Sequence, residues 1–118
     1  MSTPKVTITV RSDGGSTSVL DVKGEINAFA EAPLSEAHAQ ATAAGARNIL
    51  LNFNGLEYMN SSGIGLLVTL LIRARRQNQK LLACGLSEHY RQIFELTRLN
   101  EAIAIYPTES EALAATRR

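Results

Sequence analysis

The sequence predicts a single α/β domain with a mixed β-sheet, and three observations carry this prediction. The 118 residues are 45% hydrophobic and 19% charged, which is the composition of one globular domain. Strand-like segments alternate along the chain with segments that have helical spacing. In the middle of the chain a strand, a helix and a strand follow one another with short returns, which favours a right-handed parallel crossover. We expect one domain over residues 1–118.

The N-terminal third predicts an antiparallel hairpin. Apolar residues alternate with threonine over residues 6–10, as in a half-buried strand. Residues 13–15 turn easily, and residues 19–22 return as the second strand, with Gly24 at its exit. Residues 25–30 are expected to connect this hairpin to the first helix.

The first helix is expected to lie close to the sheet. Pro33 suits its first turn, where a missing N–H costs nothing, and Gly45 suits its C-terminal end. The residues expected on its inner face are Leu34, Ala37, Ala41 and Ala44. Residues 48–53 then show the near-continuous apolar character of a central strand covered on both faces.

A polar, glycine-flanked turn is expected after this strand, followed by a helix from about residue 62 to 77. The residues expected on its buried side are Ile64, Leu67, Val68 and Leu71. Residues 80–84 predict the next strand, and Ser87 is expected to cap a third helix. Residues 102–106 predict the last strand.

A capping box is expected to begin the terminal helix. Thr108 and Glu111 stand three residues apart, as that motif requires, and predict a helix over residues 112–117. The predicted order is therefore a hairpin of two strands followed by helix, strand, helix, strand, helix, strand and helix, with about four helices in all.

Charge and residue types argue against several classes of protein. Twelve basic and eleven acidic side chains leave a formal charge of +1, unlike a nucleic-acid binder. Residues 63–72, the longest apolar run, are too short to cross a bilayer, and residues 1–5 begin no signal peptide. We therefore expect a cytoplasmic protein without membrane insertion, as a monomer or weak dimer.

The two histidines and the single cysteine predict no metal site. His38 and His89 are far apart and lack a nearby acidic ligand pattern, and Cys84 is expected to be a buried small hydrophobe. The arginines near residue 75 are expected to form a solvated helix end.

The predicted strand ends carry asparagine, serine and glycine rather than catalytic groups. Ligands collect at the carboxyl ends of strands in open α/β sheets. A receiver-type site there would need a carboxylate pair for Mg²⁺, and a nucleophilic serine would need a base. Residues 62–65 fit neither the G-x-S-x-G elbow nor a P-loop or dinucleotide fingerprint. We expect no catalytic residue and no enzyme.

Two serines stand at the expected start of the central helix. A helix N-terminus exposes unpaired N–H groups and carries about half a positive charge, so a phosphate on one of these two hydroxyls would be stabilised there. Asn60 or Ser61 would equally serve as an ordinary N-cap, which is worth about 1 kcal/mol. Ser62 is expected to be mainly structural.

Two segments resemble the STAS domain family, the anti-sigma factor antagonists of bacterial partner-switching systems. Residues 59–65, Met-Asn-Ser-Ser-Gly-Ile-Gly, resemble the D-S/T-S-G-L/I-G motif. Residues 22–27, Val-Lys-Gly-Glu-Ile-Asn, are similar to the G-E-L/I-D segment. Asn60 and Asn27 stand where the family often has Asp. The resemblance covers nearly the whole chain and implies the STAS fold.

The resemblance also implies a cytoplasmic signal-transduction switch that regulates transcription and has no enzymatic activity or cofactor. The unphosphorylated domain would bind an anti-sigma factor, usually a serine kinase of the histidine-kinase-like ATPase fold, and so free a sigma factor. That kinase would phosphorylate Ser61, and a PP2C-type phosphatase would reverse the reaction. The residues expected to contact the partner are Asn27, Tyr58, Met59, Asn60, Ser61, Ser62 and Gly63.

Other interpretations of these residues stay open at this point. Tyr58, Met59, Ile64 and Leu86 fit either an exposed apolar rim or core positions, and residues 87–90 are expected on the same edge. A small-ligand or nucleotide sensor would use polar groups in one strand-end groove: Asn52, Asn60 and Ser61. A scaffolding module in a signalling complex would not control a sigma factor at all.

Overall fold

A five-stranded mixed sheet organises the described part of the chain, residues 5–117, in the computed structural model. Its strands lie in chain order: β1 (Val6–Ser12), β2 (Thr17–Ile26), β3 (Asn48–Met59), β4 (Lys80–Cys84) and β5 (Ala104–Tyr106). The first pair is antiparallel and the other three pairs are parallel. The predicted fold class and the predicted N-terminal hairpin are thus confirmed.

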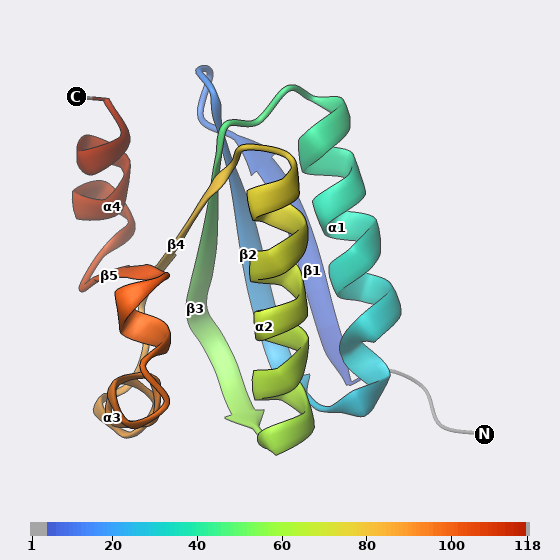
Figure 1. The fold of residues 1–118 in the computed structure, drawn as a ribbon, viewed down its shortest axis with the longest axis vertical. Helices are drawn as coiled ribbons and strands as arrows, with labels where there is room; N and C mark the ends of the chain where they lie inside the picture. Colours follow the sequence, from blue (N-terminus) through green and yellow to red (C-terminus); the bar gives the residue numbers. More distant parts are fainter. Residues whose placement is uncertain (1–4, 118) are drawn as a thin grey trace.

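Four α-helices and two short 3₁₀ turns connect the strands. They are α1 (Glu31–Ala43), α2 (Ser61–Arg76), α3 (Glu88–Leu96) and α4 (Glu109–Thr116), with η1 (Ala28–Ala30) and η2 (Leu99–Glu101). Figure 1 shows α1 and α2 side by side in front of the sheet, with α3 at the end of the molecule where α2 begins. The predicted order of strands and helices is confirmed.

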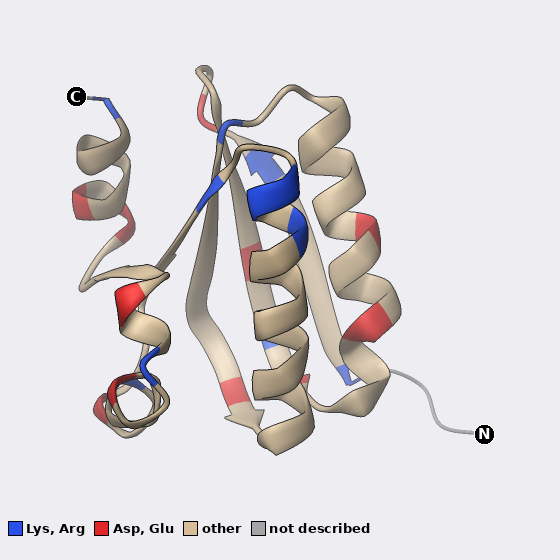
Figure 2. Cartoon of the chain, viewed as in Figure 1, with Lys and Arg blue, Asp and Glu red and all other residues tan. Residues whose placement is uncertain are grey.

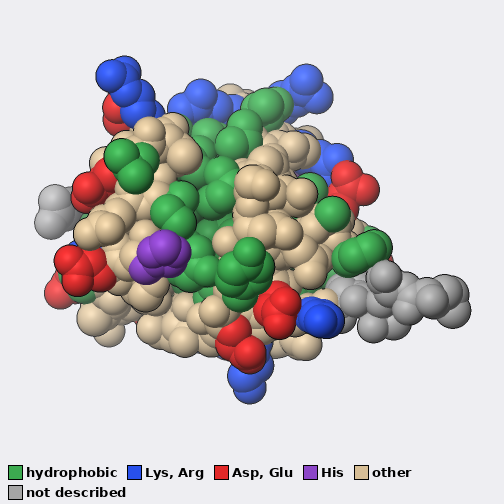
Figure 3. Space-filling model, turned by 90° about the horizontal axis from the view of Figure 1, so that it is seen from below, with side chains coloured by type: hydrophobic (Ala, Val, Ile, Leu, Met, Phe, Trp, Pro, Cys, Tyr) green, Lys and Arg blue, Asp and Glu red, His purple; other side chains and the backbone are tan. Residues whose placement is uncertain are grey.

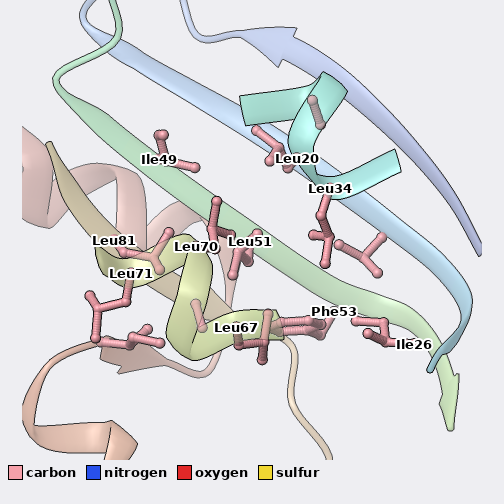
Figure 4. Packing of buried hydrophobic residues seen from close by; sticks show 14 of the residues in the cluster. Leu20, Ile26, Leu34, Ile49, Leu51, Phe53, Leu67, Leu70, Leu71 and Leu81 are labelled. Atoms are coloured by element: carbon pink, nitrogen blue, oxygen red, sulfur yellow. The ribbon is translucent and has the colours of Figure 1, made fainter. Parts of the chain in front are cut away.

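The core lies on both faces of β3. Ile49 and Leu51 point towards α1 and α2, and Leu50 between them packs with Ala112 of α4 on the other face. All three β3 side chains are fully buried, as expected for a strand covered on both sides. Figure 4 shows Leu51 beside the leucines that α2 contributes, with Ile49 further along β3.

Two strands run further than the sequence predicts. β3 continues to Met59 instead of ending at Phe53, so the expected turn at residues 54–60 is mostly strand. β2 continues through Gly24 to Ile26. Of the expected connector at 25–30, residues 25–26 are therefore strand and residues 28–30 form a 3₁₀ turn. These extensions pair with each other beyond the end of the β3–β4 pairing. Their polar residues and glycines resemble a turn sequence, since most of them are exposed or only partly buried.

Gly24 is a strand residue with a special backbone. Its φ of +105° lies in the left-handed region, and a Cβ there would collide with the carbonyl oxygen of Lys5. The β2–β3 register shifts directly after it. A glycine that indicated an exit from the strand therefore marks an irregularity within it.

The helices follow the sequence pattern with shifts at their ends. Leu34, Ala37 and Ala41 are buried on α1 as predicted, whereas Ala44 lies past the helix end and is exposed. Gly45 has a φ of +81° at the expected C-terminal position. α4 begins at Glu109, directly after its Thr108 cap.

The helix α2 begins at Ser61, and its buried face is rotated from the predicted one. Leu67 and Leu71 are buried as expected, but Val68 is 38% exposed and Ile64 is only partly buried. The residues that complete the buried face are Gly63, Leu70 and Ala74. The arginines at its end are exposed, as predicted.

Candidate functional site

The two longest strands end side by side, and this brings the two motifs of the sequence together. Glu25 lies opposite Tyr58 and Ile26 opposite Met59 in the parallel pair. The backbone N–H of Asn60 donates a hydrogen bond to the carbonyl of Ile26 at 3.2 Å. The segments 22–27 and 59–65 therefore form one surface at the carboxyl edge of β2 and β3.

Each of these strands is followed by an asparagine that caps a helical turn. The Oδ1 of Asn27 accepts a hydrogen bond from the N–H of Phe29 at 2.9 Å. The Oδ1 of Asn60 accepts one from the N–H of Gly63 at 3.0 Å. The two residues that depart from the motif aspartates thus keep a structural task that an amide oxygen performs well.

Ser61 and Ser62 are the first two residues of α2, and both are exposed. The first turn of α2 contains no acidic residue. Among the α-helices of residues 5–117, the other three each have at least one glutamate in the first turn. In Figure 2 the ribbon of α2 carries no charged residue until its far end. The positive end of this helix dipole is therefore uncompensated within α2.

Gly63 and Met59 hold the start of α2 against the sheet. A Cβ on Gly63 would collide with the carbonyl oxygen of Ile26 and would come within 2.9 Å of Met59 Cγ. Met59 is only 4% exposed and belongs to the hydrophobic core. Of the two interpretations of Met59, the core position is therefore the correct one, and its side chain positions the helix rather than facing a partner.

Two exposed aromatic side chains flank this helix start. Tyr58 is 51% exposed, as the rim interpretation expects. Phe29, also 51% exposed, lies on η1, which packs against α2. Phe29 was not predicted as a site residue, because the sequence pattern of residues 25–30 was interpreted as a connector. The available signal was an aromatic residue two positions after the segment 22–27, in a chain that is only 5% aromatic.

The helix α3 borders the same edge, as expected for residues 87–90. The N–H of Met59 donates a hydrogen bond to the hydroxyl of Tyr90 at 2.9 Å, and Tyr90 is buried. Ser87 caps α3 by accepting from the N–H of Tyr90 at 3.4 Å. His89 is exposed beside Tyr90, and Leu86 is partly buried against the core.

Asn52 does not belong to this edge, so the predicted groove of Asn52, Asn60 and Ser61 is wrong. β3 carries Asn52 in mid-strand, on the order of 20 Å from the end of the strand at about 3.3 Å per residue. Its amide donates to Glu109 Oε1 at 3.0 Å and accepts from the N–H of Asn54 at 3.0 Å. The Asn52 side chain is thus occupied inside the fold.

Glu109 belongs to a small charged cluster on the α4 side of the sheet. Arg11 contacts Glu109 Oε1 at 2.6 Å and also pairs with Asp21. The hydrogen bond from Arg11 holds the pKa of Glu109 below its usual value. The same carboxylates raise the pKa of Arg11. This cluster ties β1, β2 and α4 together and lies away from the start of α2.

The remaining reactive side chain is Cys84, which is fully buried. Burial raises the pKa of its thiol to about 11, so it stays protonated at neutral pH, and the prediction of a small buried hydrophobe is confirmed.

Residues 5–117 contain no group of three or more side chains placed to hold a metal ion. Over the same range, the helices are too short or too polar to cross a bilayer.

Comparison with known proteins gives consistent matches. The family model described as "STAS domain" matches residues 7–112. An anti-sigma-B factor antagonist of Staphylococcus aureus is 29% identical over 84 residues, which cover 71% of this chain and 78% of the relative.

Among solved structures, an anti-sigma factor antagonist from Mycobacterium paratuberculosis has a TM-score of 0.82 at 24% identity, with both chains covered completely. The antagonist SpoIIAA in its unphosphorylated form has a TM-score of 0.73 at 21% identity, covering 94% of this chain and 98% of that one. Its phosphorylated form has a TM-score of 0.67 at 23% identity, covering 93% and 99%. These structural likenesses concern the fold.

Proposed function

The chain belongs to the STAS domain family, and we propose that it is an anti-sigma factor antagonist switched by reversible phosphorylation of Ser61. The relatives and structural neighbours named as anti-sigma factor antagonists support the general role. The observation that carries the switch is the exposed Ser61 at the start of α2, whose first turn has no carboxylate.

The start of α2 suits a phosphoserine on physical grounds. A phosphate adds about −1.5 to −2 charges and three acceptor oxygens, and it meets the free N–H groups and the positive dipole end of the helix. Asn60 is neutral where the motif often has Asp, so it does not repel a neighbouring phosphate. The modified protein therefore keeps its fold.

The unphosphorylated edge offers a partner both apolar and polar contacts. Tyr58 and Phe29 supply exposed aromatic surface, and the serines and asparagines around the helix start supply hydrogen-bonding groups. A phosphate on Ser61 stands inside this contact area, so it lowers the affinity for the partner and not the stability of the fold. A loss of about 2.7 kcal/mol lowers affinity about a hundredfold.

The proposed partners follow from the family. The anti-sigma factor is a serine kinase of the histidine-kinase-like ATPase fold, and a PP2C-type phosphatase restores the binding form. ATP and Mg²⁺ are bound by the kinase, so this chain acts in the cytoplasm without a cofactor or a reaction of its own. Asn27, Asn60, Ser61 and Ser62 contact the kinase, while Met59 and Gly63 position the helix start.

Phosphopeptide mapping tests this assignment. The protein is incubated with ATP and each purified anti-sigma factor kinase encoded in the same genome. We expect one labelled peptide, which Ser61→Ala abolishes, whereas the matched control Ser62→Ala is labelled like the wild type. Equal labelling of Ser61→Ala and wild type would show that the site assignment is wrong.

The two alternative functions make different predictions. A ligand sensor would be stabilised by millimolar nucleotide in a thermal-shift screen, and the separation of Asn52 from Asn60 argues against the groove that it needs. A scaffolding module would bind a partner without serine-kinase activity. Binding by a kinase-type anti-sigma factor distinguishes our proposal from both.

A further inference from the structure

The outward face of α2 carries three residues that are not part of its buried face. Gly65, Val68 and Ile72 are spaced by three and four residues, so they lie on one line along the helix. Val68 is 38% and Ile72 48% exposed, and Gly65 is exposed as well. These three residues are called the α2 stripe below.

Neither packing nor helix stability explains the α2 stripe. The buried face of α2 is formed by other residues: Gly63, Leu67, Leu70, Leu71 and Ala74. A Cβ added at Gly65 would meet nothing within 4 Å. Glycine and β-branched residues also favour helices less than alanine or lysine. Residues that disfavour the local secondary structure without contributing to packing indicate a functional role.

A phosphorylatable serine lies at one end of the α2 stripe and two cations lie at the other. Ser61, the proposed phosphorylation site, lies one turn before Gly65, and Arg75 and Arg76 follow one turn after Ile72. The ion pairs found within residues 5–117 use other arginines, so neither Arg75 nor Arg76 has a carboxylate partner there. An apolar line that ends at two unpaired cations is complementary to an apolar surface flanked by carboxylates.

The size of the surface also favours a contact along the whole helix. A standard interface buries about 800 Å² on each partner, which is more than a helix tip provides. The 16 residues of α2 extend about 24 Å at about 1.5 Å per residue. Figure 3 looks onto the end of the molecule where α2 begins, and hydrophobic side chains form a band across it.

We propose that the α2 stripe docks the anti-sigma factor through an apolar surface whose carboxylates meet Arg75 and Arg76. This inference rests on the proposed function and adds the chemistry of the partner surface. In this proposal Ser61 lies at one end of the contact area along α2, which we call the docking line, and not at its centre. A phosphate on Ser61 therefore weakens the contact at one end of a partner that binds along the whole of α2.

Binding measurements on variants of the α2 stripe test this inference. The probe is the purified anti-sigma factor kinase that binds the wild type, measured by calorimetry with matched thermal unfolding of each variant. We expect Gly65→Gln and the double variant Val68→Ala, Ile72→Ala to weaken binding at least tenfold. Arg75→Glu with Arg76→Glu is expected to weaken binding at least tenfold at low salt and less at high salt.

Unfolding and a matched control separate docking from stability. Gly65→Gln is expected to unfold at the wild-type temperature or above, because its site is open and glycine is a poor helix former. Leu96 on α3 is 85% exposed, so Leu96→Ala removes an apolar side chain that is even more exposed, on another helix, and should bind like the wild type.

The outcomes distinguish the two proposals. If Ser61→Asp loses binding while Gly65→Gln and the arginine variant bind like the wild type, the docking line is wrong and the proposed function stands. If Leu96→Ala weakens binding as much as the stripe variants, the docking line is also wrong. If the wild type binds no anti-sigma factor kinase, the proposed function fails and the docking line with it.

Discussion

The starts of α2 and α4 share one cap geometry but differ in how their charge is balanced. Asn60 and Thr108 each accept a hydrogen bond from the N–H three residues on. The first turn of α4 holds Glu109, which in turn pairs with Arg11. The first turn of α2 holds two exposed serines and no carboxylate. The positive end of the helix dipole is thus balanced by a carboxylate of the chain itself at α4. At α2 it is not balanced, and the serines there are accessible to modification.

The close packing beneath the start of α2 is the first way to test this comparison. Gly63→Ala should destabilise the protein by about 1–3 kcal/mol, because the added methyl collides with the Ile26 carbonyl and Met59. Urea denaturation measures the change. The control Gly65→Ala, in open space, should stabilise by about 0.5–1 kcal/mol. Equal effects of the two alanines would contradict the packing described here.

Removal of the N-cap side chain should lower the free energy of unfolding by similar amounts at α2 and α4. Asn60→Ala and Thr108→Ala should each destabilise by about 1 kcal/mol, since each leaves a helix N–H without its acceptor. Asn60→Asp should retain the cap and add about 0.3–1 kcal/mol from the helix dipole. Denaturant midpoints measure all three. An Asn60→Ala variant as stable as the wild type would mean that Asn60 is not a working cap.

The charge balance at α4 should be visible in its pH dependence. The folded pKa of Glu109 is lowered by Arg11, so its contribution to stability is complete above the usual pKa of 4.5 and is lost as pH falls through the folded pKa. The wild type should therefore exceed Glu109→Gln in stability by at most about 1 kcal/mol at pH 7, because the pair is partly exposed.

Thermal unfolding of both proteins from pH 7 down to pH 3 measures this difference. We expect the advantage of the wild type over Glu109→Gln to shrink only below about pH 4.5. An advantage that is unchanged at pH 3, or that is already lost at pH 6, would mean that the Glu109 carboxylate is not the group involved.

The sequence predicted the elements whose pattern comes from burial. The hairpin, the central strand with Ile49, Leu50 and Leu51, and the capped helices all follow from residue period and cap chemistry. The ends of β2 and β3 could not be predicted, because β4 does not pair with β3 there and the exposed polar residues and glycines of both strands resemble a turn.

The candidate site was predicted in part. The motif placed Ser61 at a helix start, and the structure shows that start beside Asn27. Met59 was ambiguous, because an apolar residue at a strand end fits either core or rim. Phe29 was missed and Asn52 was misplaced for one reason: residue pattern alone does not reveal how far a strand extends or which strand ends meet.

The central claim concerns one charge at one serine, and the affinity of the phosphorylated protein tests it most directly. The kinase-phosphorylated and untreated forms are titrated with the anti-sigma factor, with Ser110→Asp at the start of α4 as a control for added charge. We predict at least a hundredfold weaker binding of the phosphorylated form with its unfolding temperature retained, and wild-type binding of Ser110→Asp. Equal affinity of the phosphorylated and untreated forms would contradict the account.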